Sequence, residues 1–154
     1  MFEFRLYSVS KLFPSRGLVV TNSQMIDSWI KSRDTGFYSV EYSITSVGGK
    51  HSKTQNFNPD FFIKATKNGI SHFFVVETKS DGDVNDENKA KLKYGRQHFE
   101  DLNKELVEQS INHIYHFHFL SPNSYDAFFS SLKSGGLFED KFRSDLEDKL
   151  EEEV

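Results

Sequence analysis

Asp60, Glu77 and Lys79 are the residues whose types and spacing could support chemistry, with Pro59 before the aspartate and Thr78 between the other two. Two carboxylates held side by side repel each other, so they need a compensating charge. A divalent cation could supply it, because Mg²⁺ takes one or two protein carboxylates and completes its octahedron with water and substrate phosphate. These residues therefore predict a metal site, provided that the fold brings them together.

A β-hairpin is predicted to bring them together. Asn68 and Gly69 stand between two apolar, β-rich runs, and an Asn-Gly pair favours a type I′ turn because both positions need a positive φ. With these two residues as the loop, Asp60 lies directly opposite Glu77, with Cβ atoms about 4.5–5.5 Å apart. Lys79 projects to the same face, as alternate residues of a strand do. Both faces of the hairpin are largely apolar, so we expect it at the centre of a sheet that is covered on both sides.

The string Pro59-Asp60 followed by Glu77-Thr78-Lys79 resembles the PD-(D/E)xK nuclease signature. The wider sequence is similar to the C-terminal nuclease domain of type III-like restriction enzymes, in which the nuclease is linked to a helicase. The similarity spans roughly residues 23–132. Its further matching stretches are Trp29-Ile30-Lys31, Phe57-Asn58, Val75-Val76, Asn88-Lys89-Ala90-Lys91, His98-Phe99 and Phe117-His118-Phe119-Leu120-Ser121-Pro122.

This resemblance implies a Mg²⁺-dependent DNA endonuclease that hydrolyses phosphodiester bonds, with Mn²⁺ able to replace Mg²⁺. Asp60 and Glu77 would hold the metal, and the Thr78 carbonyl would be a third ligand. Lys79 would orient the attacking water and stabilise the charge that develops on the phosphate. DNA and an adjoining helicase or translocase, as a domain or a subunit, are the implied partners.

The family usually supplies one more acidic residue from its first helix, and this chain departs from that pattern. The expected first helix, residues 23–32, offers Asp27, which does not stand where the additional acid is expected. Glu3 and Glu41 are the other candidates. The number of metal ions therefore stays open.

The Glu-x-Lys triplet alone is a weak signal, because it recurs at Glu87, Glu139 and Glu147 in charged, helix-patterned stretches. Only the triplet at Glu77 ends an apolar strand. One alternative is an ordinary amphipathic hairpin whose acids face water. Another is a non-catalytic module that uses the same fold to dock DNA or protein, although a purely binding surface gains nothing from opposed carboxylates.

The remaining chain predicts the elements that position this hairpin. Apolar periodicity indicates further strands and helices along the chain. The expected elements are a helix at 23–32 capped by Ser23, a strand at 37–45, a helix at 87–109, a strand at 111–120, and helical segments at 124–131 and 140–153. Two β-like runs within residues 1–20 are hard to place. The order α-β-β-β-α-β predicts an α/β fold with a restriction-endonuclease-like core, in which helices flank a central mixed β-sheet.

The helix expected at 87–109 carries basic residues on both edges of its apolar stripe. Gly95 lies within the stripe and would let the helix approach the sheet closely. Lys91 lies on one edge, and Lys89 and Arg96 lie on the other. Because this helix follows the metal-site strand, we expect Lys91, with Lys89 and Arg96, to contact DNA phosphates.

The chain has 154 residues, of which 15% are aromatic and none is cysteine. This length suits one domain, residues 1–154, with an acidic helical tail at about 139–154, and the abrupt start suggests a piece of a longer helicase-nuclease chain. The net charge of −4 is concentrated in the acidic segment, and the near-neutral remainder predicts modest DNA affinity, so a neighbouring domain or partner would have to add to it. No apolar stretch reaches the roughly 20 residues of a membrane span, and a cytoplasmic location, which the lack of cysteine fits, is expected.

Overall fold

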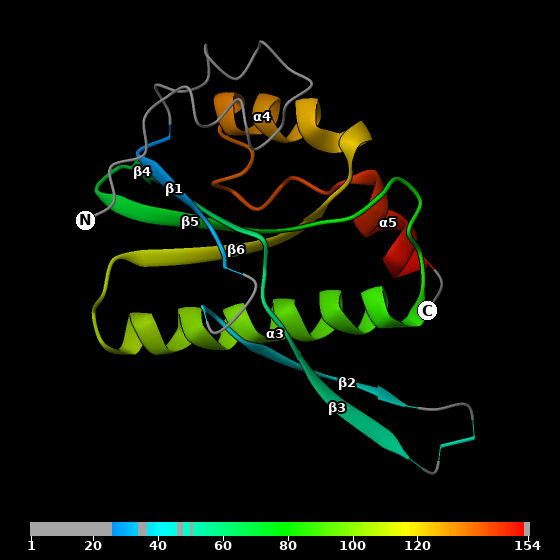
Figure 1. Ribbon diagram of the computed structural model, residues 1–154. Coiled ribbons are helices and arrows are strands. Elements are labelled where there is room, and N and C mark those ends of the chain that lie inside the picture. Colours follow the sequence, from blue (N-terminus) through cyan, green and yellow to red (C-terminus); the bar gives the residue numbers. More distant parts are fainter. Residues whose placement is uncertain (1–25, 34–36, 46–47, 50, 153–154) are drawn as a thin grey trace.

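A four-stranded mixed sheet forms the centre of the computed structural model, which describes residues 26–33, 37–45, 48–49 and 51–152 (Figure 1). The strand order is β1-β4-β5-β6. β4 runs antiparallel to both of its neighbours, β1 and β5, and β6 runs parallel to β5. The bounds are Ser28–Lys31 for β1, Phe61–Lys67 for β4, Ile70–Thr78 for β5 and His113–Leu120 for β6. The predicted fold class, a central mixed sheet flanked by helices, is confirmed.

The hairpin of β4 and β5 has the predicted register. Phe61 pairs with Val76, and the ladder continues to the last pair beside the turn. Asn68 and Gly69 form the loop with φ values of 52° and 77°. Only residues that tolerate positive φ can close so tight a turn. The Asn-Gly pair therefore fixes which residues stand opposite each other at the far end of the hairpin.

Helices cover both faces of the sheet (Figure 1). On one face, Phe61, Ile63 and Phe74 pack with Phe128 of α4, Tyr125–Ser134; a 3₁₀ turn, Pro122–Ser124, leads into this helix. The other face, which includes Val75, Phe117 and Phe119, packs against α3, Asp86–Glu108, and α5, Asp145–Glu152. The hairpin is therefore held by packing on both of its faces.

Helix α3 approaches β6 as closely as the sequence predicts. Asn85 caps its first turn by accepting a hydrogen bond from the Asn88 backbone N–H. A Cβ atom on Gly95 would lie 2.2 Å from Cε1 of Phe117. No ordinary side chain fits there, so glycine is required for the helix to sit on this strand.

Two further strands form a separate antiparallel ribbon, and the sequence predicted only one of them. β2, Val40–Thr45, matches the expected strand, whereas no strand was predicted for β3, Ser52–Phe57. Figure 1 shows the ribbon extending away from the central sheet beside α3. β3 is polar along most of its length because most of its side chains face water, so it lacks the apolar alternation that marks a half-buried strand.

The prediction of a helix at 23–32 is wrong for residues 26–32, the part of this range that the structure describes. Ser28–Lys31 forms β1, which pairs with β4, and residues up to 25, including the expected cap Ser23, lie outside the described part of the chain. Ile26 and Trp29 pack on the core, Trp29 from this edge strand and Ile26 from the residues before it. Trp and Ile favour strands, and pairing with β4 outweighs a short helical pattern. The β-like runs within residues 1–20 also lie outside the described residues.

The acidic segment predicted as a tail at 139–154 packs on the rest of the protein over residues 139–152, the part that the structure describes. α5 begins at Asp145, and its Leu146 and Leu150 are 1% and 3% exposed. Glu147 is fully buried, accepts hydrogen bonds from the backbone N–H groups of Ser144 and Phe119, and lies 3.2 Å from Nδ1 of His118. The segment is part of the folded body, and its acids are not all free to repel DNA.

His116 lies buried on the α4 face of β6. Its ring stacks on Phe74 at 4.8 Å between centroids, and its Nε2 lies 2.9 Å from Nδ1 of His72. Burial, together with the charges that His72 and His118 would carry, lowers the pKa of His116 to about 4. The folded protein therefore disfavours the charged form of this ring.

This buried histidine predicts loss of stability in mild acid. The unfolded chain takes up a proton near pH 6.5 and the folded chain only near pH 4, so stability falls as the pH drops through that window. His116 should contribute a loss of about 2 kcal/mol between pH 7 and pH 5. Urea unfolding at several pH values measures this loss. In His116→Phe, the free energy of unfolding should change less steeply with pH between pH 7 and pH 5. An equally steep slope in the variant would exclude this histidine as the cause.

Candidate metal and nuclease site

Asp60 lies at the open end of the hairpin, one residue before the start of β4. Its Oδ2 accepts two hydrogen bonds from Thr78, at 2.8 Å from the backbone N–H and 2.7 Å from the hydroxyl. These bonds hold the Asp60 carboxylate against the last residue of β5. The register places Asp60 next to Glu77, as the Asn-Gly turn predicted.

Glu77 is a buried carboxylate, 5% exposed, on the same strand end. Its Oε1 lies 2.8 Å from Nζ of Lys79, and among the described residues its buried Oε2 has no hydrogen-bond partner. Burial raises the pKa of Glu77, and the nearby charge of Asp60 raises it further, against the opposing effect of Lys79. A buried carboxylate oxygen without a partner is unfavourable, so this oxygen calls for a cation or a donor from outside the described chain.

Lys79 keeps its positive charge at this site. Burial opposes protonation, but the ion pair with Glu77 and the charges of Asp60 and Asp83 together outweigh it and raise the pKa of Lys79. The side chain can therefore donate hydrogen bonds and stabilise negative charge, and it is not suited to act as a base near neutral pH.

The backbone of Thr78 points toward Asp60. The Lys79 backbone N–H bonds to the Leu120 carbonyl of β6, so the neighbouring residue Thr78 faces the other side, toward the β4 end. Its N–H does reach Asp60. In an extended strand the carbonyl of a residue points to the same side as its N–H. The Thr78 carbonyl is thus on the side of the Asp60 carboxylate.

These donors fit a hard divalent cation. Two carboxylates and one backbone carbonyl are oxygen ligands of the kind that Mg²⁺ takes, with water in the remaining positions. Within residues 26–152 as far as they are described, no cluster of three or more His, Cys, Asp or Glu side chains could hold a metal ion. A tetrahedral zinc site is not expected from this donor set.

A network beside the carboxylates was not predicted from the sequence. The Tyr42 hydroxyl donates to Oε1 of Glu87 at 3.1 Å, and Lys91 pairs with the same oxygen at 2.7 Å. Lys91 also lies over the rings of Tyr42 and Phe57, at 5.4 and 5.9 Å from their centroids, and its charge opposes the rise in the pKa of Glu77. The one available signal was the i, i+4 spacing of Glu87 and Lys91 at the start of α3.

The three basic residues predicted to bind DNA do not lie together. Lys91 is beside the carboxylates, whereas Lys89 and Arg96 line a pocket of about 530 Å³ between α3, β2 and α5. Arg96 forms ion pairs with Glu147 and Glu151 of α5. A role for Lys89 and Arg96 in DNA binding stays a prediction.

Two of the three candidates for an additional acid lie in the described part of the chain. Asp27 accepts a hydrogen bond from the Thr66 hydroxyl. Thr66 lies near the turn, at the end of the hairpin far from Asp60. Glu41 is exposed on β2, and Glu3 lies outside the described residues. Besides the pair itself, the fold brings Asp83 and Glu87 near Lys79. Lys91 and Tyr42 lower the pKa of Glu87 most, and the charge of Lys79 lowers it further.

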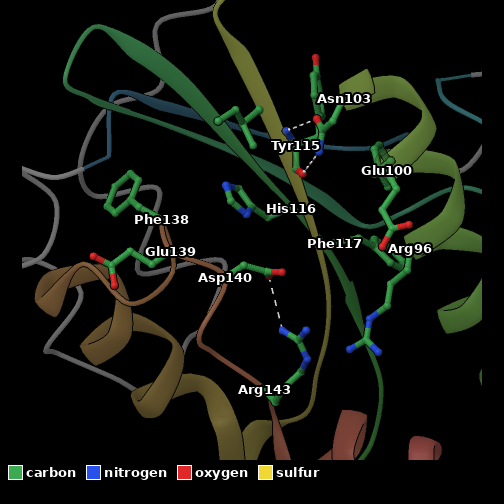
Figure 2. A pocket seen from close by; sticks show the side chains of 12 residues that line it. Arg96, Glu100, Asn103, Tyr115, His116, Phe117, Phe138, Glu139, Asp140 and Arg143 are labelled. Atoms are coloured by element: carbon green, nitrogen blue, oxygen red, sulfur yellow. Dashed lines mark hydrogen bonds and ion pairs between the residues drawn. The ribbon is translucent and has the colours of Figure 1, made fainter. Parts of the chain in front are cut away.

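A second pocket, of about 350 Å³, lies between α3, β6 and residues 138–143 (Figure 2). Asn103 covers the outer edge of β6 there, donating to the Tyr115 carbonyl and accepting from its N–H, both at 2.8 Å. None of Asp60, Glu77 and Lys79 lines this pocket. The carboxylates lie at an open strand end and not in either of these cavities.

A family model described as an endonuclease domain matches residues 51–117 of this chain. The match supports a restriction-endonuclease-like nuclease. It covers β3, the hairpin with Asp60, Glu77 and Lys79, helix α3 and part of β6. Comparison with curated proteins found no match, and comparison with solved structures found none. In the described part of the chain, none of the helices has the length and apolar character needed to cross a membrane.

Replacing Asp60 tests the pairing of the two carboxylates. Because the pKa of Glu77 is raised in the folded protein, its ionisation lowers stability as the pH rises through that value. At neutral pH, Asp60→Asn removes the repulsion while keeping an acceptor for Thr78, and should stabilise the protein in EDTA by about 1 kcal/mol. Thermal melting measures this, with Asp148→Asn on the surface of α5 as a control expected within about 0.5 kcal/mol of the unaltered protein. A variant that melts lower than the unaltered protein in EDTA would contradict the pairing.

Proposed function

We propose that this chain is a Mg²⁺-dependent DNA endonuclease domain of the PD-(D/E)xK type. The observation that carries the proposal is the buried Oε2 of Glu77, which has no partner among the described residues and lies beside Asp60 and Lys79. The large majority of buried polar side-chain atoms have a hydrogen-bond partner, so an oxygen without one among the described residues favours a ligand from outside them. A carboxylate that holds a metal ion needs a free oxygen, and the matched endonuclease domain contains all three side chains.

The side chains divide the work in this proposal. Asp60 and Glu77, with the Thr78 carbonyl, would hold Mg²⁺ or Mn²⁺. When bound, the ion would lower the pKa of a water molecule and neutralise charge on the phosphate. Thr78 fixes the Asp60 carboxylate through two hydrogen bonds, so the ligand is held in place before DNA arrives.

Lys79 and Lys91 would act on the substrate. The protonated Lys79 orients the attacking water and stabilises the negative charge that grows on the phosphate oxygens in the transition state. Glu87 and the rings of Tyr42 and Phe57 hold Lys91 beside Glu77. From there Lys91 can contact a neighbouring phosphate of the bound strand.

The wider context is part of the proposal. The chain has a net charge of −4, and affinity that rests on phosphate contacts alone would be modest. An adjoining helicase or translocase, in the same polypeptide or in a partner subunit of a restriction system, would bring the DNA to the site. We place such a system in the cytoplasm. A docking module with the same fold would not require the unpartnered Glu77 oxygen.

Loss of nicking in site variants tests this function. Glu77→Gln removes a metal ligand and Lys79→Ala removes the charge that stabilises the transition state, so each should reduce Mg²⁺-dependent plasmid nicking by at least about 100-fold. Glu139→Gln and Lys141→Ala are matched controls, because they alter a second Glu-x-Lys triplet that forms an exposed ion pair elsewhere.

Both site variants should keep the circular dichroism spectrum of the unaltered protein. Nicking should also stop in EDTA and resume with Mg²⁺ or Mn²⁺. If Glu77→Gln nicks plasmid DNA at the rate of the Glu139→Gln control, the assignment of the site is wrong.

A further inference from the structure

The outer face of the β2–β3 ribbon consists of polar side chains. Cross-strand pairing places Glu41 opposite Asn56, Ser43 opposite Thr54 and Thr45 opposite Ser52. Five of these six residues are exposed, and Ser43 is partly exposed. The hydroxyls of Ser43 and Thr54 lie 3.2 Å apart. No apolar side chain interrupts this face among the described residues of the two strands, so it lacks the apolar centre of a protein-docking surface.

The root of the ribbon is built into the body. Val40, Tyr42 and Phe57 are buried on its inner face, and the Phe57 ring packs on Phe117 of the central sheet at 6.0 Å. Because the root is fixed in the core, the exposed face has a defined position relative to the sheet.

The ribbon is also continuous with the candidate metal site. β3 ends at Phe57 and leads through two residues to Asp60. From the inner face, the Tyr42 hydroxyl lies 3.0 Å from Oε1 of Gln55 and 3.1 Å from Oε1 of Glu87, which share its single proton, and Glu87 binds Lys91. β3 is therefore the strand that leads directly into the candidate metal site.

The dimensions of the ribbon match a DNA groove. Two strands about 4.8 Å apart fit a major groove about 12 Å wide, which admits a two-stranded ribbon. Alternate residues on one strand are about 6.7 Å apart, close to two base-pair steps of about 3.4 Å. Ser, Thr and Asn side chains offer the uncharged donors and acceptors that pair with base edges.

We propose that the β2–β3 ribbon lies in the major groove of duplex DNA beside the cleaved phosphate and contacts base edges through Thr54 and Asn56. This inference rests on the proposed nuclease function and adds a source of sequence preference to it. Asn56 and Thr54 lie about 13 and 20 Å along the chain from Asp60. Base preference should therefore be confined to one side of the cut, roughly four to six base pairs away.

A cross-linking experiment tests the position of the ribbon without cleavage. The chain has no cysteine, so Thr54→Cys creates a single attachment point for a photoactivated cross-linker. Ser130→Cys, exposed on α4, is the matched control. With a mixed-sequence duplex in EDTA, the Thr54→Cys variant should cross-link to DNA at least about ten times more than the Ser130→Cys variant, a difference equal to about 1.4 kcal/mol in local occupancy. Equal cross-linking by the two variants would overturn the proposal.

Sequencing of cut ends tests the readout. A library of duplexes with random sequence, cleaved in Mg²⁺, should show base preference on one side of the cut, and the Thr54→Ala/Asn56→Ala double variant should flatten it. Cleavage without preference in the unaltered protein, or an unchanged preference in the double variant, would overturn the readout while the nuclease function stands. Cross-linking by the Thr54→Cys variant, together with an unaltered protein that never cleaves, would instead reject the nuclease function and keep the ribbon as a DNA contact.

Discussion

The proximity of Asp60 to the buried carboxylate of Glu77 is the constraint on which the rest of this structure depends. Burial and the neighbouring charge both raise the pKa of Glu77, and within the described part of the chain Lys79 binds one of its oxygens while the other has no partner. Such a pair lowers the stability of a folded protein unless a bound ligand offsets the repulsion. In the function proposed above, a bound cation would relieve these unfavourable electrostatics.

The fold holds this pair in place from several directions. The Asn-Gly turn sets the register from the far end of the hairpin. Apolar side chains pack against both faces of the hairpin, one cluster on each face. Gly95 lets α3 sit directly on β6, which brings Glu87 and Lys91 to the edge of the site. A rigid, doubly covered hairpin can hold ligands within the small tolerance that metal-assisted catalysis needs.

The sequence predicted those features that depend on local chemistry. The turn residues gave the register, and apolar periodicity gave α3 and β6. Features set by tertiary contacts were missed. β1 is a strand because its backbone pairs with β4. β3 is a strand because its backbone pairs with β2, although most of its side chains are polar and face water. The burial of Glu147 depends on His118 and Arg96, far away in sequence. The position of each carboxylate at the site could be predicted, but the surrounding network of Tyr42 and Glu87 could not.

Crystals of the protein soaked in Mn²⁺ would test the central claim most directly, because anomalous scattering locates this ion without reference to activity. The account predicts a peak between the two side chains, about 2.0–2.3 Å from a carboxylate oxygen of Asp60 and from Oε2 of Glu77. The peak should be absent from crystals of Glu77→Gln. Strong anomalous peaks elsewhere on the protein, with none between Asp60 and Glu77, would contradict the account.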